Sequence, residues 1–390
     1  MKSMLIIVPG LAMGGTERIA CNVVDVLKDT FHVTLAVFGR KNAFFSPNCE
    51  VIDLELPAVA GTVKKTWNVL KRAAALRRLK RERKFDYCMA FGGSANLPAI
   101  LSGDGHTVVT TLHLWEGIQL IKRTTFLYRK CLKIGCVSEL MAQEIEKRYP
   151  SLRGKTATIY NPYNITEIRR MGCEEVGDYA FEGRVLINHG RLEDVKNLPR
   201  LIKAFSLVHN RCPDTKLLIV GEGSRRGQLE DMILQYHLED CVTLLGSREN
   251  PFSYLSKATL FVGSSFHEGF PNSLVEAMAF CPAVMVDCQC GPREILSNGP
   301  IDRVCTDVEE AEYGILVPPA KSEIFSMELT EDDCVLAKGI LSILEDQNKL
   351  TQYREKARMR AEMFNYAAYR DRIIKLFEGN ESTPDEILNG

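Results

Sequence analysis

The most informative segment of this 390-residue chain is Ser264-Ser265-Phe266-His267-Glu268-Gly269-Phe270-Pro271-Asn272-Ser273-Leu274-Val275-Glu276-Ala277-Met278. It follows a short apolar run, Leu260–Gly263, and passes through a glycine-containing loop into a helix expected to begin near Asn272 or Ser273. The first turn of such a helix carries free backbone N–H groups, which bind anions. Two carboxylates, Glu268 and Glu276, bracket that turn. The segment therefore predicts a strand–loop–helix unit with an anion site between two acidic side chains.

The residues alone leave a second interpretation open. Ser273 and Glu276 have the spacing of a capping box, in which the glutamate only closes the end of the helix. Glu268 lies beside Gly269 and could equally be a solvated loop residue. The local pattern thus predicts the shape of the unit without choosing between a binding role and a structural role for its carboxylates.

Short apolar runs alternate with helical segments along the chain, which is the pattern of parallel sheets covered by helices. The runs expected to form strands are Met4–Val8, Val33–Phe38, Tyr87–Phe91, Val108–Leu112 and Lys133–Val137 in the first half, and Val185–Asn188, Lys216–Val220, Val242–Leu245, Leu260–Gly263 and Ala283–Val286 in the second. Helices are expected between them, for example over Arg18–Lys28 and Lys64–Arg83. We therefore predict an α/β chain of two doubly wound, Rossmann-like domains. Such sheets bind ligands at the carboxyl ends of their strands, so the domains are expected to face each other across a cleft.

The predicted N-terminal domain covers residues 1–170 and the predicted C-terminal domain covers residues 180–360, with a linker near Tyr163–Gly183. The helical tail at about 365–390 is expected to pack back on the first domain. Residues 300–333 interrupt the alternation, because acidic clusters are frequent there and helix signals are few. We interpret them as an inserted surface loop.

The two carboxylates form a Glu-x7-Glu pair around Gly-Phe-Pro-Asn-Ser, and this segment closely resembles the signature of the retaining glycosyltransferases of family 4, which have the two-domain GT-B fold. Other segments that resemble the family, in the order expected for it, are Gly14-Gly15-Thr16-Glu17, Thr111-Leu112-His113, Cys136-Val137-Ser138-Glu139, Ile159-Tyr160-Asn161-Pro162, His189-Gly190-Arg191-Leu192 with Lys196-Asn197, Val220-Gly221-Glu222-Gly223 and Leu245-Gly246-Ser247-Arg248. Each is short, but together they cover nearly the whole chain.

The resemblance implies a nucleotide-diphosphate sugar as donor, with a UDP-sugar preferred and a GDP-sugar as the alternative. Negative charge develops on the departing diphosphate, and fixed cations and amides stabilise it. Arg191 and Lys196 would supply two such cations, so no metal and no other cofactor is expected. Glu268 would contact the transferred sugar, and His113 the sugar or the acceptor. These four are the predicted catalytic residues.

The resemblance also assigns a nucleotide site. Glu276 is expected to accept hydrogen bonds from the ribose hydroxyls, and Arg248 to lie near the base. The predicted donor-binding residues are Gly15, Gly190, Glu222, Arg248, Phe270, Asn272, Ser273, Leu274 and Glu276. The transferred sugar is expected to be a hexose or an N-acetylhexosamine.

Lys64–Lys84 is strongly basic, with ten lysines and arginines and a single acidic residue. A solvated helix face with a buried apolar stripe, formed by Val63, Trp67, Leu70 and Ala74, is one interpretation. The preferred one is an amphipathic surface for anionic lipid headgroups or an anionic acceptor, contacted by Lys64, Lys71, Arg72 and Arg78. Family members that act on polyprenyl-diphosphate-linked sugars carry basic helices in this domain, so the resemblance implies the same acceptor class.

The net charge of −1 hides an asymmetry. Residues 1–175 hold 26 lysines and arginines against 16 aspartates and glutamates, a net of +10, whereas the remainder holds 23 against 34, a net of −11. The positive half is the one expected to meet the acceptor and the membrane. The basic helix lacks the interleaved aromatic residues of a single-strand platform, so no nucleic-acid partner is expected.

Three further classes are disfavoured. Thirteen cysteines are too sparse and odd in number for a disulfide framework, and the cluster Cys281, Cys288 and Cys290 lacks a histidine at zinc-finger spacing. Gly10–Gly15 has the wrong spacing for a dinucleotide fingerprint. No apolar run is long enough for a membrane span. Because the cysteines are expected to be reduced and the basic helix to meet anionic lipid, we expect a cytoplasmic protein peripheral at the inner face of the cytoplasmic membrane.

The expected activity is therefore a retaining, metal-independent transfer of sugar to a saccharide acceptor, linked to polyprenyl diphosphate, in polysaccharide or glycan biosynthesis. One alternative is a sugar-nucleotide epimerase or a phosphorylase on the same fold. The Glu-x7-Glu pair disfavours the first, and the lack of a pyridoxal-phosphate lysine motif disfavours the second. The other alternative is a non-catalytic partner protein derived from the GT-B fold, which the presence of Arg191, Lys196, Glu268 and Glu276 disfavours.

Overall fold

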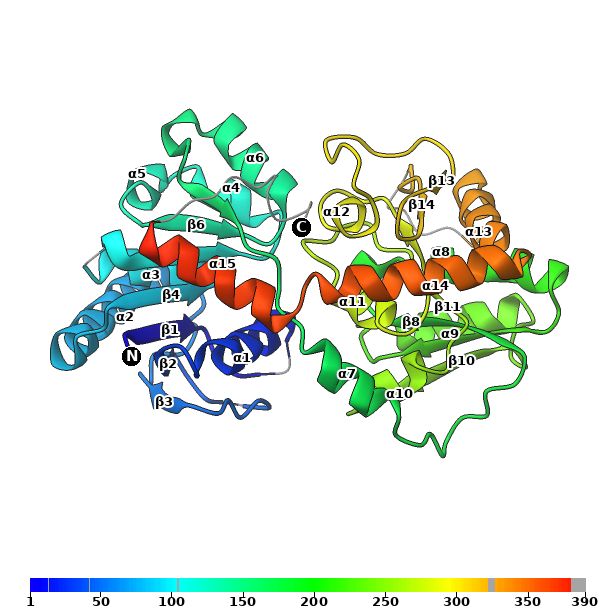
Figure 1. The fold of residues 1–390 in the computed structure, drawn as a ribbon, viewed down its shortest axis with the longest axis horizontal. Coiled ribbons are helices and arrows are strands. Elements are labelled where there is room, and N and C mark those ends of the chain that lie inside the picture. The colour runs from blue at the N-terminus through cyan, green and yellow to red at the C-terminus, as the bar shows by residue number, and fades with distance from the viewer. Residues whose placement is uncertain (13, 42, 104, 322–326, 380–390) are drawn as a thin grey trace. The chain divides into compact units, whose positions relative to one another are not determined.

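The computed structural model describes residues 1–12, 14–41, 43–103, 105–321 and 327–379 (Figure 1). They form two compact units. Unit 1 contains Met1–Pro162 together with the chain from Asn365 onward, and unit 2 contains Tyr163–Phe364. Each unit is built on a seven-stranded sheet.

The sheet of unit 1 is parallel throughout, in the order β3-β2-β1-β4-β5-β6-β7. Its strands are β1 (Ser3–Val8), β2 (His32–Val37), β3 (Glu50–Asp53), β4 (Tyr87–Phe91), β5 (Val108–Leu112), β6 (Lys133–Cys136) and β7 (Thr156–Thr158). Its helices are α1 (Gly15–Leu27), α2 (Thr62–Arg83), α3 (Gly93–Leu101), α4 (Gly117–Ile121), α5 (Thr125–Tyr128), α6 (Glu139–Arg148) and α15 (Tyr366–Glu378), with 3-10 turns at Gly105–Thr107 and Pro150–Leu152.

Both faces of this sheet are buried, which explains why its strands are continuous apolar runs. Along β1, Met4, Ile6 and Val8 pack with residues of α1 and α15. The intervening Leu5 and Ile7 pack with residues of α2 and α3 on the opposite face. Two apolar cores therefore sandwich the sheet.

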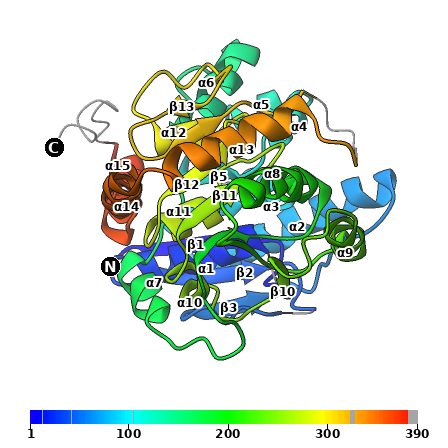
Figure 2. The same cartoon turned by 90° about the vertical axis from the view of Figure 1, so that its right-hand side faces the viewer.

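Unit 2 has the order β10-β9-β8-β11-β12-β14-β13, with only β13 antiparallel to its neighbour among the described strands. Its strands are β8 (Arg184–His189), β9 (Thr215–Val220), β10 (Val242–Gly246), β11 (Leu260–Gly263), β12 (Ala283–Val286), β13 (Glu309–Glu310) and β14 (Ile315–Val317). Its helices are α7 (Ile165–Gly172), α8 (Leu198–Arg211), α9 (Arg226–Gln235), α10 (Phe252–Leu255), α11 (Asn272–Met278), α12 (Pro292–Leu296), α13 (Glu331–Leu344) and α14 (Gln347–Glu362), with a 3-10 turn at Asp194–Lys196. In Figure 2, α8 packs beside α13 and α11 packs beside α14.

The predicted fold class is confirmed. All ten predicted strands are present, each with ends within one residue of the expected position. The strand order in both sheets reverses direction next to the first strand, as in doubly wound folds.

The predicted linker is wrong for its first half. Tyr163 is only 1% exposed and belongs to unit 2. The helix α7 follows it, and the buried Ile165 and Ile168 of α7 lie on the face that packs toward α10. The helix α7 is short, and its few apolar residues lie among charged ones. Its amphipathic pattern is therefore difficult to recognise in the sequence.

The predicted surface loop at residues 300–333 is also wrong. The strand β14 lies within it, is fully buried, and pairs with β12 inside the sheet. Its acidic cluster at Glu331–Asp333 is the first turn of α13, where negative charge interacts favourably with the helix dipole. Thr330 and Asp333 form a capping box there, and Asp333 also pairs with buried Lys203 at 2.7 Å. Residues 322–326 of this prediction lie outside the described residues.

The helical tail predicted at about 365–390 contains α15, which contributes Tyr369, Ile373, Leu376 and Phe377 to the core of unit 1. The helix α14, which precedes it in the chain, is part of unit 2. Residues 380–390 of the predicted tail lie outside the described residues. Among the helices that are described, none has the length and apolar character needed to cross a bilayer.

Candidate active site

The candidate site in unit 2 arises where its strand order reverses. The central strands β8 and β11 are neighbours, with Leu260 opposite Leu186 and Phe261 opposite Ile187. In the chain, β8 is followed by β9 and β11 is followed by β12, and these two strands lie on opposite sides of the β8–β11 pair. The loop after β8 and the loop after β11 therefore leave neighbouring strand ends and run in opposite directions. Doubly wound folds bind ligands at this point. Residues 190–197 and 264–271 form the two loops.

The loop after β8 rests directly on the turn after β9, with no side chain between them. A Cβ atom added to Gly221 would lie 1.8 Å from the Gly190 carbonyl oxygen, and one added to Gly223 would lie 2.4 Å from the Leu192 oxygen. The Leu192 N–H donates to the Glu222 oxygen at 2.9 Å. The predicted glycine turn thus serves a close approach of two backbones.

Three hydrogen bonds tie the two loops of the site together. The Ser264 hydroxyl donates to the Lys196 carbonyl oxygen at 2.8 Å, and the Phe266 N–H donates to the Val195 oxygen at 2.9 Å. The Lys196 ammonium donates to Glu268 Oε1 at 2.6 Å. The two predicted catalytic residues on different loops are therefore in direct contact.

The Lys196–Glu268 pair is shielded but still reachable from solvent. The two side chains are 18% and 13% exposed. The Ser265 hydroxyl also donates to Glu268 Oε1, at 2.7 Å, which fixes the carboxylate. Burial and then the Glu268 charge raise the pKa of the nearby Cys288 thiol well above its usual value, so that thiol is neutral. Close apolar surroundings strengthen the electrostatic effect of the ammonium on any bound ligand.

Gly190 and Arg191 lie on the same loop as Lys196. A Cβ atom at Gly190 would meet Lys196 Cε at 3.3 Å, so a glycine leaves room for the lysine side chain. Arg191 is exposed, and the neighbouring Glu193 accepts hydrogen bonds from the Ser224 N–H and hydroxyl. Those hydrogen bonds hold the pKa of Glu193 below its usual range. The guanidinium of Arg191 thus extends from a firmly held loop into solvent.

The structure excludes the capping role for Glu276. The helix α11 begins at Asn272 with Pro271 as its N-cap, so Ser273 and Glu276 both lie within the helix rather than at its cap. Glu276 is 3% exposed, and its Oε2 lies 3.7 Å from Nδ1 of His189. A buried carboxylate beside an imidazole suits recognition of hydroxyl groups better than closure of a helix end.

The expected row of free amides is partly wrong. The Leu274 N–H donates to the Pro271 oxygen at 3.0 Å, because the first turn of α11 is tight. Asn272 Oδ1 accepts a 2.5 Å hydrogen bond from the Tyr163 hydroxyl. The Phe270 ring is 6% exposed and packs edge-to-face on Phe364, with centroids 5.4 Å apart. These contacts support the loop from within unit 2.

Arg248 and Glu222, both predicted near the donor, are held by ion pairs. Arg248 Nη2 lies 2.6 Å from Asp178 Oδ2, and its Nε donates to the Tyr254 hydroxyl at 3.1 Å. Tyr254 in turn donates to Asp178 Oδ1 at 2.5 Å. This hydrogen bond and then Arg248 hold the pKa of Asp178 below its usual range. Glu222 pairs with Arg226 at 2.6 Å.

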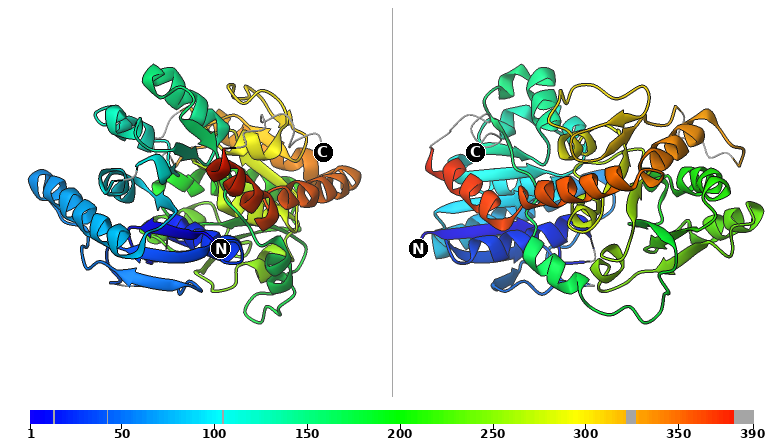
Figure 3. Two further views of the ribbon diagram at one scale, coloured as in Figure 1. Left: turned by 60° about the vertical axis from the view of Figure 1, so that its left-hand side comes forward. Right: turned by 45° about the vertical axis from the view of Figure 1, so that its right-hand side comes forward.

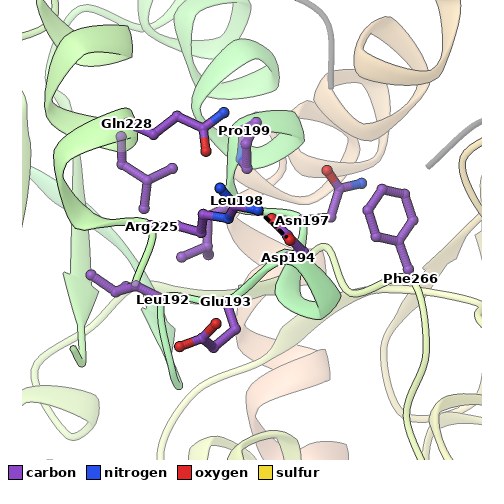
Figure 4. Close-up of a pocket in the computed structure, with 10 residues that line it drawn as sticks. Leu192, Glu193, Asp194, Asn197, Leu198, Pro199, Arg225, Gln228 and Phe266 are labelled. Carbon is purple, nitrogen blue, oxygen red and sulfur yellow. Dashed lines mark hydrogen bonds and ion pairs between the residues drawn. The ribbon is translucent and has the colours of Figure 1, made fainter. Parts of the chain in front are cut away.

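A cavity of about 60 Å³ is bounded in part by the loop at residues 190–197 (Figure 4). It is lined by Leu192, Glu193, Asp194, Asn197, Leu198, Pro199, Arg225, Gln228, Leu229 and Phe266. Arg225 pairs with Asp194 across it at 2.6 Å. None of its lining residues is among the predicted donor-binding residues.

In unit 1, His113 follows β5 and is held on two sides. Its ring stacks on Phe91, with centroids 5.6 Å apart, and its Nε2 lies 2.9 Å from the Thr111 hydroxyl. That hydroxyl donates its own proton to the Ala90 oxygen, so it accepts from Nε2–H and leaves Nδ1 as an acceptor. Loss of solvation lowers the pKa of His113 to about 4. His113 is therefore a neutral hydrogen-bond acceptor at neutral pH.

The glycine loop of unit 1 leads into α1. The Arg18 N–H donates to the Gly14 oxygen at 3.0 Å, and α1 begins at Gly15. A Cβ atom at Gly14 would lie 2.2 Å from Glu17 Oε2. The glycine therefore makes room for the Glu17 carboxylate in the first turn of the helix.

The basic helix α2 divides its charges between two faces, and the prediction for Arg72 is wrong. Arg72 is 4% exposed, donates to the Leu56 and Ser94 carbonyl oxygens, and stacks 4.2 Å above the Phe38 ring. Because its donors satisfy backbone groups inside unit 1, it does not meet an external partner. Lys80 is buried in the same way and donates to the Gly103 oxygen.

The other three predicted contacts on α2, Lys64, Lys71 and Arg78, are exposed. An apolar stripe that faces solvent accompanies them, formed by Val63, Trp67 and Leu70, which are 83%, 60% and 49% exposed. A solvated helix face would not carry a large apolar stripe, so the structure favours the amphipathic interpretation.

The sequence did not identify four residues of the site. Ser265 and His189 lie inside quoted segments, and their strand-end positions could have indicated them. Asp178 and Tyr254 belong to separate segments, and nothing in the local pattern connects them to Arg248.

Two family models match the chain. The model described as "Glycosyl transferases group 1" matches residues 179–360, and the model described as "Glycosyltransferase Family 4" matches residues 13–167. The first lies within unit 2, and the second covers most of unit 1. Each of the two units thus matches its own glycosyltransferase model.

Several known proteins are similar over most of their length. An uncharacterized glycosyltransferase of Methanocaldococcus jannaschii is 29% identical over 74% of this chain and 78% of its own. The N-acetylgalactosamine-N,N'-diacetylbacillosaminyl-diphospho-undecaprenol 4-alpha-N-acetylgalactosaminyltransferase of Campylobacter jejuni is 25% identical over 94% and 96%. The structure of Anabaena HepE in complex with UDP and glucose superimposes with a TM-score of 0.72 at 18% identity, over 97% of this chain and 100% of that one.

Proposed function

Since the chain belongs to the family 4 glycosyltransferases and is a GT-B enzyme of glycan biosynthesis, we propose that it is a retaining, metal-independent enzyme that uses a UDP-sugar. Its acceptor in this proposal is a saccharide linked to polyprenyl diphosphate. The transferred sugar is a hexose or an N-acetylhexosamine.

The observation that carries the proposal is the contact between Lys196 and Glu268. A lysine and a glutamate from two loops meet at the reversal point of the unit 2 sheet, at 2.6 Å, and Ser265 orients the glutamate. Such an arrangement holds an ammonium group in place before any ligand binds. A cation fixed in advance stabilises developing negative charge without reorganisation during the reaction.

Arg191 and Lys196 together account for a reaction without metal. The departing nucleotide diphosphate carries charge that needs neutralisation, and a planar guanidinium contacts two phosphate oxygens at once. Arg191 extends from the same loop as Lys196, so both cations serve one phosphate group. We expect the rate to be unchanged after treatment with EDTA.

The nucleoside is assigned to the buried carboxylate of Glu276. Ribose presents two hydroxyl donors, and a carboxylate that is 3% exposed and lies beside His189 is suited to accept them. The Anabaena HepE structure, which has the same fold, holds UDP, and this supports uridine as the first base to test.

The acceptor class is supported by one relative and one surface. The Campylobacter jejuni relative acts, by its name, on a saccharide attached to diphospho-undecaprenol. In this chain Lys64, Lys71 and Arg78 are exposed on α2 beside an apolar stripe. Basic and apolar side chains on one helix suit an anionic bilayer surface, so we place the enzyme at the cytoplasmic face of the membrane.

The test is a screen of UDP- and GDP-sugars with a polyprenyl-diphosphate-linked saccharide, read by mass spectrometry, with the anomeric configuration of the product read by NMR. We expect transfer from a UDP-sugar with the donor configuration retained. Lys196→Ala is the inactive control, and Lys216→Ala, which removes an outlying lysine paired with Glu182, is the matched active control. Transfer from GDP-sugars alone, inversion, or loss of activity in EDTA would each refute the corresponding part of the proposal.

A further inference from the structure

The connection between β5 and β6 exposes large apolar side chains. Leu114, Leu120 and Phe126 are 63%, 69% and 61% exposed. All three lie within 13 residues of the chain, over α4, α5 and the residues just before them. Single exposed apolar residues are ordinary, but a local group of this size marks a surface that meets an apolar partner.

These side chains are presented by folded structure. Ile118 and Ile121 of α4 and Tyr128 of α5 are buried beneath them. The Tyr149 hydroxyl on the adjoining segment donates to the Ile118 oxygen at 3.1 Å, which anchors α4. The inward face of the connection is therefore packed, and the outward face carries the apolar group.

Exposed basic residues alternate along the chain with the apolar ones. Lys122, Arg123, Arg129 and Lys130 are all exposed, and Glu116 is the single acidic residue among residues 114–130. Exposed apolar and basic side chains on one short segment match the boundary between acyl chains and anionic headgroups. A soluble protein partner for this face would need carboxylates around an apolar centre, whereas an anionic bilayer offers both features everywhere on its surface.

The connection also has a defined place beside the candidate site. It begins immediately after His113, at the carboxyl end of β5. The helix α3 packs against α2 and against α5, so the two basic elements flank one helix of unit 1 (Figure 3). The segment therefore starts at the residue that is predicted to contact the sugar or the acceptor.

We propose that residues 114–130 form a membrane-insertion segment, in which Leu114, Leu120 and Phe126 enter the interfacial layer of an anionic bilayer. The inference rests on the proposed function only for the role given to the segment, which is to capture a lipid-linked acceptor. Its physical content is separate, because the segment binds through apolar burial whereas the charged face of α2 binds through electrostatic attraction.

The two tryptophans of the chain make this distinction measurable. Trp115 lies within the segment and Trp67 lies on α2. The Trp67→Phe variant therefore leaves Trp115 as the only tryptophan, and Trp115→Phe leaves Trp67. Each is mixed with vesicles of phosphatidylglycerol and phosphatidylcholine, with and without bromine-labelled acyl chains.

Insertion predicts that Trp115 emission moves to shorter wavelength and is quenched by the brominated chains. The quenching persists when salt is raised after binding, because apolar burial is not screened. Leu120→Gln and Phe126→Gln should each lower the partition coefficient by about tenfold. The matched control is Leu234→Gln, at an equally exposed leucine on α9 of unit 2 (56% exposed), and it should bind as the unmodified chain does.

Three outcomes would overturn the inference. The first is vesicle binding without a change in the emission or quenching of Trp115. The second is an equal loss of binding in Leu234→Gln. The third is self-association in solution that Phe126→Gln abolishes, because that result would assign the face to a second copy of the chain. The proposed function is judged separately, on a water-soluble short-chain acceptor. Transfer without Trp115 insertion defeats only the membrane segment, and insertion without transfer to any acceptor defeats only the proposed activity.

Discussion

The two sheets of this molecule have the same order over their first five strands but place different chemistry at their central loops. In unit 2, the loops after β8 and β11 carry charged side chains in contact, Lys196 with Glu268. In unit 1, the loop after β1 carries glycines, and β5 ends in a histidine whose pKa is lowered to about 4. The shared topology positions a site in each unit, and the loop residues decide what each site can bind.

The difference extends to how each unit uses its cations. Unit 1 has many exposed lysines and arginines on α2 and around α4 and α5, which suits a broad anionic surface. Unit 2 holds Lys196 in a defined pair with Glu268 and carries Arg191 on the same loop, so in the proposed function both act over a short distance on one ligand. The charge asymmetry of the sequence therefore reflects a diffuse electrostatic role in one unit and a local role in the other.

The largest expected effect concerns the charged pair. Lys196→Ala removes a fixed cation beside the departing phosphate, so kcat should fall by about 10²–10³. Steady-state kinetics with saturating donor measure this, and Lys216→Ala is the control. A kcat within threefold of the unmodified enzyme would assign Lys196 a structural role and remove the contrast between the units.

The second effect concerns the buried carboxylate. Glu276→Gln keeps the shape of the side chain but weakens its acceptance of ribose hydroxyls, so the donor KM should rise about 10-fold to 100-fold, the range of hydrogen bonds to charged groups. The KM for the acceptor should not change. Equal changes in both KM values would indicate a general disturbance of unit 2. Glu345→Gln, at an exposed glutamate paired with Arg211, is the matched control.

The third prediction separates the two faces of α2. Arg72→Ala leaves two carbonyl oxygens in unit 1 without their donor, so the free energy of unfolding should fall by about 2–3 kcal/mol. Lys71→Ala, one residue away and exposed, should change stability by less than about 0.5 kcal/mol but weaken binding to anionic vesicles. Urea unfolding and vesicle sedimentation of both variants test this. Identical behaviour of the two variants is the contrary result.

The smallest effect is a pH dependence from His113. Its pKa of about 4, below the ordinary 6.5, means that the folded chain binds this proton less readily than the unfolded chain. The stability contribution is therefore fully present above pH 6.5 and is lost as the pH falls toward 4. The loss attributable to this group at pH 5 is about 2 kcal/mol. His113→Gln should flatten the change in unfolding free energy between pH 7.5 and pH 5 by that amount.

The strands were predictable because each is a continuous apolar run between loop signals, as in Tyr87–Phe91 and Ala283–Val286. The strand β14 was missed because only Ile315–Val317 form it, and acidic residues on both sides resemble a surface loop. The structural role of the acidic residues after β14 depends on contacts that form only in the folded chain, since Asp333 caps α13 and pairs with Lys203. A run of three apolar residues carries too little pattern to predict a strand without its neighbours.

The site was predictable where its residues lie in one segment and unpredictable where distant segments meet. Glu268 and Glu276 share a strand–loop–helix unit, so their importance is visible along the chain. The burial of Arg72 could not be predicted, because periodicity shows which residues share a helix face but not which face packs against the core. Asp178 reaches Arg248 only through the fold of unit 2.

The assignment of the successive helices α14 and α15 to different units has a consequence for biosynthesis. Unit 2 is one continuous stretch of chain and can complete its core once Phe364 has left the ribosome. Unit 1 begins first but finishes last, because the apolar face under α1 stays open until Tyr369, Ile373 and Phe377 are made. The nascent chain thus holds an incomplete first unit while about 200 residues of the second are synthesised, at roughly 5–20 residues per second. For that interval, the uncovered apolar face of unit 1 is a surface prone to aggregation.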